Sequence, residues 1–466
     1  MSASPASPLV ASPRARLDRS LPVLGAFAVG AIAYGGLYCF PPLSLAFARD
    51  FGVGRALAVT PWTVFLLVTA LSSPLLGRAY DVILDRQLLL AGMLVLAVGW
   101  LAASVAPDIG LLTLAYGIFL AVGLELVFVG TTTAIARRYA GVAGLALGVA
   151  YAGPGVGVAI ALPVVTAVLR GTDWRVVTAG FAALSLVGIP FVLLMTSGPA
   201  IVVPLREPPG PRPEPEPRRR PVRLDLADEQ AHGILRETSA PGAIGAAQEH
   251  GPRPGRRGAE GLRRTLRTRR FWLLFVAAAG IGAADEGVFQ AFLPHATGRG
   301  MSEGLAAEAL ALQSLAYVVG QIAGGALSDR VGRRFVGVVI ALATIGGLTG
   351  AFAGSGDAPA LAIGGLAVHG FGLGATIAIR SAAFSDVFGG ADFGALFGVL
   401  AIAYPTGGIV ATEIGAVGFD RLGTYWPAYW TAVVSMALWA VGLWVAGPRR
   451  HGLRARLVRL RDRLTS

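Results

Sequence analysis

The chain has 466 residues, of which 54% are hydrophobic and only 14% are charged, and its mean hydropathy is +0.65. A soluble protein of this length would carry about a quarter charged residues, so the composition excludes an ordinary soluble domain. The net charge of +12 comes from Arg in loops and tails, where membrane topology explains it, and we expect no nucleic-acid partner. The single cysteine, Cys39, excludes a disulfide within the chain, and we expect no metal or cofactor.

Apolar stretches long enough to cross a bilayer as helices recur along the whole chain. We place them at about 22–47, 60–79, 88–106, 110–136, 142–169, 174–196, 271–294, 305–327, 335–354, 359–386, 394–418 and 425–446. The sequence therefore predicts an all-α membrane protein of twelve transmembrane helices. Its predicted divisions are a disordered N-tail (1–20), a six-helix half (21–196), a linker (197–270), a second six-helix half (271–447) and a basic C-tail (448–466).

The distribution of Arg between loops predicts the orientation of the chain. With both termini inside, the cytoplasmic segments hold 32 Arg and the outer loops hold 6. Without the long linker the count is still 17 against 6. Since cytoplasmic loops of membrane proteins are enriched in basic residues, we predict a plasma or inner membrane protein with cytoplasmic termini. The Leu and Arg pattern of the C-tail is typical of a helix on the anionic inner leaflet.

A short basic sequence joins the eighth and ninth predicted spans, from Gly325 through Asp329, Arg330 and Gly332 to Arg333 and Arg334. A degenerate copy joins the second and third spans, with Gly77, Asp81 and Arg86. Other similarities recur at an almost constant offset of 248 to 252 residues, in the pairs Gly77/Gly325, Asp81/Asp329, Gly144/Gly394, Gly148/Gly398, Phe40/Phe292 and Pro42/Pro294. The halves are therefore interpreted as an internal duplication.

The pattern G-x-x-x-D-R-x-G-R-R resembles the signature loop of the major facilitator superfamily. That resemblance implies two pseudo-symmetric six-helix halves with a substrate site between them near the bilayer midplane. It also implies that Asp81 and Asp329 meet the N-terminus of a helix in the opposite half and close an inner gate, an interaction that helix dipoles favour. For Asp329 the alternative is a simple helix cap.

Within the superfamily, several stretches resemble the monocarboxylate and oxalate/formate transporter group. They are Phe40-Pro41-Pro42, Ala136-Arg137-Arg138-Tyr139, Gly144-Leu145-Ala146-Leu147-Gly148, Pro163 and Asp173-Trp174-Arg175. The first span lacks the acidic-Gly pair of many animal monocarboxylate carriers. Gly153-Pro154 also resembles the Gly-Pro motif of drug/proton antiporters, although Phe119 stands where those antiporters carry a membrane Arg. The glycines of this fifth span are otherwise typical of close helix packing.

Charged residues inside the predicted spans are the candidate site residues, because such charges are unfavourable in lipid and tend to be functional. Glu125, Asp285 and Glu286 lie in the middle of the fourth and seventh spans. Because Asp285 and Glu286 are adjacent, their side chains point about 100° apart, and we expect Glu286 to face the central cavity and Asp285 to contact another helix. A buried carboxyl group makes proton coupling available. Glu413, in the outer half of its span, is interpreted as structural.

Arg380 and His369 share the tenth span and, being eleven residues apart, should lie on one face about 16 Å apart along the axis. Arg380 can hold a substrate carboxylate with its planar fork or pair with an acid of a neighbouring helix. His369 can be a packed neutral imidazole or a proton carrier. By the resemblance, every candidate except Glu413 lies on a helix that lines the cavity.

These features predict a secondary transporter rather than an enzyme, working by alternating access on a small organic solute, with protons and the lipid bilayer as its other partners. We expect a monomer and an organic anion such as a monocarboxylate as the substrate. A drug or cation/proton antiporter is the alternative, and a membrane sensor or scaffold that has lost transport is a further one.

The predicted topology can be tested by labelling. A cysteine introduced at Ser239, in the linker, should be protected from a membrane-impermeant thiol reagent in sealed right-side-out cells, because the linker is predicted to be cytoplasmic. Strong labelling at this position would reject the orientation.

Overall fold

The computed structural model describes residues 13–79, 84–139, 143–197, 263–388, 396 and 399–448. The first half contains α1 (Pro13–Leu37), α2 (Phe40–Asp50), α3 (Arg55–Ala79), α4 (Asp85–Ser104), α5 (Ile109–Leu114), the π-helix η1 (Ala115–Leu120), α6 (Ala121–Arg138), α7 (Ala143–Val168) and α8 (Trp174–Met195). The second contains α10 (Arg269–Gly298), α11 (Glu303–Val331), α12 (Arg333–Gly354), α13 (Pro359–Phe388), α15 (Ala403–Leu422) and α16 (Trp426–Ala446). Most of the linker, residues 1–12, residues 449–466 and Asp81 lie outside the described residues, and α1 begins within the segment that was predicted to be a disordered N-tail.

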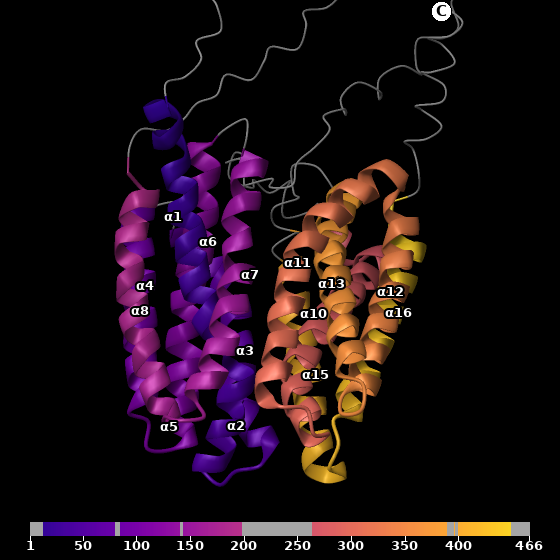
Figure 1. Cartoon of the computed structure of the whole chain (residues 1–466). Helices are drawn as coiled ribbons and strands as arrows, with labels where there is room; N and C mark the ends of the chain where they lie inside the picture. Colours follow the sequence, from indigo (N-terminus) through magenta and orange to yellow (C-terminus); the bar gives the residue numbers. More distant parts are fainter. Residues whose placement is uncertain are drawn as a thin grey trace, which may run out of the picture.

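The helices form two bundles side by side, one from each half of the chain (Figure 1). Twelve of the described segments are long and apolar enough to cross a membrane, which confirms the predicted number. The halves repeat the same packing: α1 contacts α7 as α10 contacts α15, and α4 contacts α8 as α12 contacts α16. The halves meet where α7 contacts α11 and α3 contacts α15. We call the end of the bundle that carries α5 the α5 end, and the opposite end, reached by residues 197 and 263, the linker end.

Glycines let several of these helix pairs approach to backbone contact. A Cβ added at Gly153 or Gly157 of α7 would meet the backbone carbonyl of Phe27 or Ala31 in α1. In the second half, Gly282 of α10 and Gly407 of α15 lie in the same way against each other's helices. In lipid, where apolar surface gains nothing by helix association, such contacts are a principal source of packing energy. The expectation is wrong for Gly148, because nothing lies within 4 Å of an added Cβ there.

The first membrane segment is broken between α1 and α2. Pro41 and Pro42 open α2 and have no N–H group to donate to the preceding turn. The carbonyl of Leu37, at the end of α1, instead accepts a 2.6 Å hydrogen bond from the buried Tyr116 hydroxyl. Tyr116 lies in η1, where the fourth segment widens into a π-helix. A side chain of the π-helix thus satisfies a carbonyl that the break in the first segment leaves free, as a low-dielectric interior requires.

The basic signature of the second half is mostly helical, whereas the predicted spans left a turn at about 328–334. Helix α11 continues through Asp329 and Arg330 to Val331, and α12 begins at Arg333. Gly332 alone separates them, with a φ of 117° that side chains rarely allow. One glycine therefore reverses the chain, so the turn needs fewer residues than the hydropathy pattern indicated.

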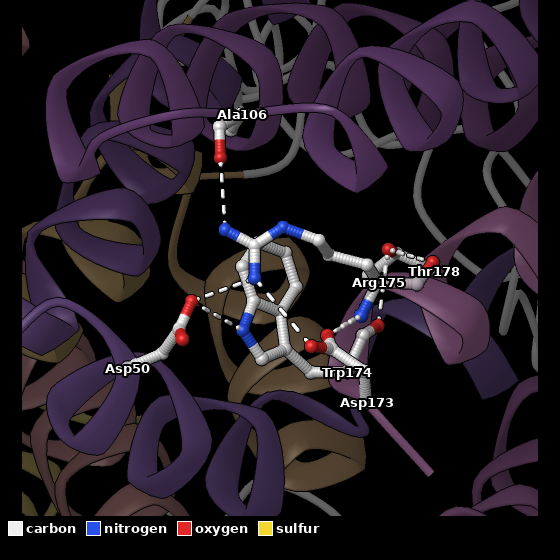
Figure 2. Close-up of polar contacts among 6 residues, drawn as sticks. All are labelled: Asp50, Ala106, Asp173, Trp174, Arg175 and Thr178. Atoms are coloured by element: carbon white, nitrogen blue, oxygen red, sulfur yellow. Dashed lines mark hydrogen bonds and ion pairs between the residues drawn. The ribbon is translucent and has the colours of Figure 1, made fainter.

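At the α5 end, Arg175 joins three segments of the first half (Figure 2). Its guanidinium donates to the Asp50 carboxylate at 2.7 Å and to the Ala106 carbonyl at 3.3 Å, and it lies over the Trp174 ring at 4.3 Å. The Trp174 indole N–H also donates to Asp50, at 3.1 Å, and Asp173 caps α8 by accepting from the backbone N–H of Arg175 at 2.7 Å. The Asp-Trp-Arg triplet thus connects α2 and the turn after α4 to the start of α8.

We expect Arg175→Lys to destabilise the protein although it keeps the charge. An ammonium group cannot reproduce the planar fork that bonds Asp50 and Ala106 together. Because the side chain of Arg175 is 34% exposed, solvent screens part of the pair, and the loss should be about 1–2 kcal/mol. Thermal unfolding in detergent measures it. Arg421→Lys, at an exposed position of the same end, is the control, and equal melting temperatures for the two variants would contradict the role given to Arg175.

Candidate functional site

Two adjacent acids on α10 lie at the boundary between the halves. Glu286 is buried, with 1% of its surface exposed. Its carboxylate accepts hydrogen bonds from the Trp62 indole at 3.1 Å, the Tyr38 hydroxyl at 3.3 Å and the Tyr404 hydroxyl at 3.3 Å. Trp62 and Tyr38 belong to the first half, on α3 and in the break before α2, so the carboxylate of Glu286 joins the two halves. Buried carboxylates need such donors.

The neighbouring Asp285 is partly exposed and accepts a 2.7 Å hydrogen bond from the same Tyr404 hydroxyl. We expected Glu286 to face the central space and Asp285 to make an interhelical contact. Asp285 does contact another helix, through Tyr404 of α15, but it is Asp285 that keeps exposed surface, and Glu286 is buried against the opposite half. The two side chains do diverge, but Tyr38 and Trp62 of the opposite half fill the space beside Glu286. Tyr404, on α15, is the common donor to both acids.

Arg380, on α13, is partly exposed and lies near this pair without bonding to it. Its guanidinium carbon is 5.8 Å from the centre of the Tyr404 ring. Its Nη1 is buried and has no hydrogen-bond partner. Among the described side chains, no acid lies within ion-pair distance of this guanidinium. Tyr404 therefore lies between the acids and the Arg, with its hydroxyl toward the acids and its ring facing the cation.

The remaining sequence candidates lie apart from this group. His369 is fully buried and its ring contacts the backbone of Ala284 in α10, which corresponds to the packed neutral imidazole. Although it shares α13 with Arg380, the two residues therefore meet different helices. Glu125, on α6, is 6% exposed and lies close to Tyr34 of α1.

The aromatic residues of this site were missed in the sequence. Tyr34 stacks on Tyr38 with ring centres 5.9 Å apart, and Tyr38 meets the edges of Trp62 and Phe289 at 5.2 and 5.5 Å. Further tyrosines that keep partly exposed surface come from three other helices: Tyr151, Tyr317 and Tyr404. The spacing of four between Tyr34 and Tyr38 places them on one helix face, a signal that could have identified at least this pair.

The predicted gating residues lie at the linker end. Asp329 accepts a 2.8 Å hydrogen bond from Arg333, which also contacts Asp386 of α13. These bonds lie within the second half, and the expected contact of Asp329 with the opposite half is not made among the described residues. In the first copy, Gly77 lies in α3, Arg86 is exposed in the first turn of α4, and Asp81 lies outside the described residues.

The α5 end is where polar contacts fasten the halves together. Gly54 precedes α3 and offers no side-chain cap, and Asp420 of α15 instead accepts from the backbone N–H groups of Arg55 at 2.8 Å and Ala56 at 2.9 Å. Thr63 donates to Glu413 at 2.5 Å, in keeping with the structural role expected for Glu413. Two further side chains, Arg49 and Glu303, pair across the halves at 3.4 Å.

These features are those of a membrane transporter with two related halves. The sequence matches the family model of the Major Facilitator Superfamily over residues 26–310 and 277–462. The chain belongs to the major facilitator superfamily, and it is a transporter rather than an enzyme. No match to the sequence was found among curated proteins.

Solved structures of two transporters share the fold. A bacterial homologue of the human lysosomal transporter Spinster, in an inward-facing and unoccupied conformation, is 16% identical, with a TM-score of 0.60 and 94% coverage of both chains. The nucleoside transporter NupG, crystallised as a point mutant, is 13% identical, with a TM-score of 0.66 and coverage of 91% of this chain and 99% of the other. At these identities the likeness concerns the fold.

Tyr404→Phe should destabilise the protein more than Tyr38→Phe. The first change removes the donor to both acids, including the 2.7 Å bond to Asp285, whereas the second removes one 3.3 Å bond to Glu286. A buried acceptor left without its donor loses about 1–3 kcal/mol, so the melting temperature in detergent should fall further for Tyr404→Phe. The same fall in both variants would show that Tyr404 has no special place between the acids.

Proposed function

We propose that this protein transports a small organic anion, such as a monocarboxylate, by alternating access coupled to protons. The observation that carries the proposal is Arg380, a guanidinium within the bundle whose Nη1 is buried without a hydrogen-bond partner. An Arg in a membrane interior is unfavourable unless it is paired. With Asp285 and Glu286 bonded to Tyr and Trp donors, a carboxylate of the substrate is the counter-ion left for Arg380.

The neighbourhood of Arg380 supports a substrate that combines a carboxylate with an apolar body. The planar guanidinium fork binds a carboxylate with two parallel hydrogen bonds. The aromatic rings of Tyr34, Tyr38, Tyr317 and Tyr404 offer apolar surface with hydroxyl groups at its edge. Binding at this point would contact both halves of the chain.

Proton coupling is proposed for the pair Asp285 and Glu286. Two adjacent carboxyl groups inside the bundle disfavour double ionisation, since like charges repel strongly where water is scarce. Tyr404 donates to both acids and stacks under Arg380, so an anion bound at Arg380 would change the electrostatic field at the acids through a single side chain. This gives substrate and proton a physical means of influencing each other.

The closed α5 end supports an inward-facing state. Since the Arg count places the linker and termini in the cytoplasm, the α5 end is proposed to face outward. The polar contacts made by Asp420, Glu413 and Glu303 then close the outer side. The open side would be the linker end, where Asp329 bonds within its own half. The structure of the bacterial Spinster homologue, which shares the fold, is also in an inward-facing conformation, in agreement with this assignment.

A drug or organic cation exchanged for protons is the second candidate. The observation that favours it is the partly exposed Asp285 among aromatic rings, since carboxylates and aromatic faces both attract cations. Uptake assays separate the candidates by the charge of the transported solute. If the protein transports neither organic anions nor organic cations, the sensor or scaffold is the remaining interpretation.

Arg380→Lys should lower transport of a labelled monocarboxylate at least about 10-fold in proteoliposomes, because Lys keeps the charge and loses the bidentate geometry. The assay uses an inward proton gradient and a panel of labelled carboxylates, with Arg267→Lys, an exposed position, as the control. Normal affinity in Arg380→Lys would contradict substrate binding there. Rescue of an unstable Arg380→Ala by removal of Asp285 or Glu286 would identify a structural ion pair instead.

A further inference from the structure

A small hollow at the α5 end lies between the halves and away from Arg380. We call it the α5 hollow. It is bordered by Ser44 and Arg55 from the first half and by Gln290, Thr412 and Tyr425 from the second. Its cavity volume is about 10 Å³, which is enough for about one water-sized particle.

Polar atoms without partners border this space. Gln290 is 5% exposed, and neither its amide nitrogen nor its amide oxygen has a hydrogen-bond partner. Thr412 is 3% exposed, and its hydroxyl is likewise without one. On the side of the first half, Nη1 of Arg55 is buried and unbonded. Buried polar groups are rarely left in this condition, and four such atoms around one hollow indicate a bound occupant.

The chemistry of these atoms favours an anion over a cation or water alone. Arg55 carries a permanent charge and can only donate, while the Gln290 amide and the Thr412 hydroxyl can each supply a further donor. Burial raises the pKa of Tyr425 to about 12, so its hydroxyl also keeps its proton. Asp420 is an acid that contacts Arg55. It is exposed, and its carboxylate accepts from the backbone N–H groups of Arg55 and Ala56 rather than from the Arg55 guanidinium. The residues that border the hollow therefore offer more donors than acceptors, and they include a cation but no acid.

We propose that the α5 hollow binds a single monatomic anion of about the size of chloride, held by Arg55, Gln290 and Thr412. This anion site is distinct from the proposed substrate site, because Arg380 is not among the residues that border the hollow. Since Arg55 comes from one half and Gln290 and Thr412 from the other, the site exists only while the α5 end is closed. Binding therefore stabilises the closed α5 end by mass action.

The test uses the purified full-length protein in detergent, with sodium gluconate exchanged for sodium chloride at constant ionic strength. Chloride should raise the melting temperature by at least about 2 °C, with saturation as its concentration increases. Bromide, the monatomic ion nearest to chloride in size and charge, should act like chloride. Equal melting temperatures in chloride and gluconate would overturn the proposal and leave water as the occupant.

Two variants with matched controls locate the effect. Thr412→Val removes the unbonded hydroxyl at nearly constant volume and should abolish the chloride shift. Thr166→Val removes a buried hydroxyl that bonds its own helix at 2.8 Å and should keep the shift. Arg55→Gln should abolish the shift, and Arg49→Gln, which loses a contact between the halves at the same end, should keep it. A chloride shift that survives both Thr412→Val and Arg55→Gln would refute the site.

A second measurement does not depend on melting. Spin labels at Val105 and Asp357, exposed positions at the α5 end of the two halves, report the separation of the halves by pulsed electron paramagnetic resonance. The buried native cysteine is replaced as Cys39→Ser. Chloride should shift the distance distribution toward the shorter population, and an unchanged distribution in chloride and gluconate would count against the site. Neither measurement requires transport, so a failure of the proposed substrate leaves this result unaffected.

Discussion

A carboxylate buried in a membrane protein needs hydrogen-bond donors, and the structure depends on how this chain supplies them to Glu286. Two of the donors, Trp62 and Tyr38, come from the first half, and the third, Tyr404, comes from α15 of the second. Because one acid holds both halves, the centre of the bundle cannot open without leaving that carboxylate to water or to a proton. The site and the contact between the halves are therefore the same set of atoms.

Around that centre, glycine determines how near the helices come. The backbones of α1 and α7 touch at Gly153 and Gly157, and those of α10 and α15 touch at Gly282 and Gly407, so this pair of helices is closely packed in both halves. Polar contacts between the halves then collect at the α5 end. Two closely packed halves that are joined by polar contacts at one end can rotate against each other as rigid bodies. Alternating access works in this way in folds built from repeats.

The number of helices and the duplication could be predicted because both depend on local composition, and the structure has twelve spans in two halves with matching packing. The division of roles between Asp285 and Glu286 could not, since it depends on Tyr38 and Trp62, which are remote in sequence. The end of α11 was also predicted too early. The apolar stretch ends before Asp329, but the helix continues through Asp329 and Arg330 and stops only at Gly332. The tyrosines were overlooked because aromatic residues are ordinary components of an apolar helix, and only their shared orientation marks them.

The π-helix η1 has a consequence for the orientation of everything that follows it. A π-turn holds about one residue more than an α-turn, so removing one residue from Ala115–Leu120 would let the segment rewind as a regular helix. If the residues on one side of the deletion kept their contacts with α4, the residues on the other side would rotate by about 100° around the helix axis. Either Tyr116 would leave the Leu37 carbonyl or Glu125 would turn away from Tyr34. The π-helix therefore sets the rotation of the fourth segment. With this rotation, Tyr116 bonds the Leu37 carbonyl and Glu125 also lies toward Tyr34 in the interior.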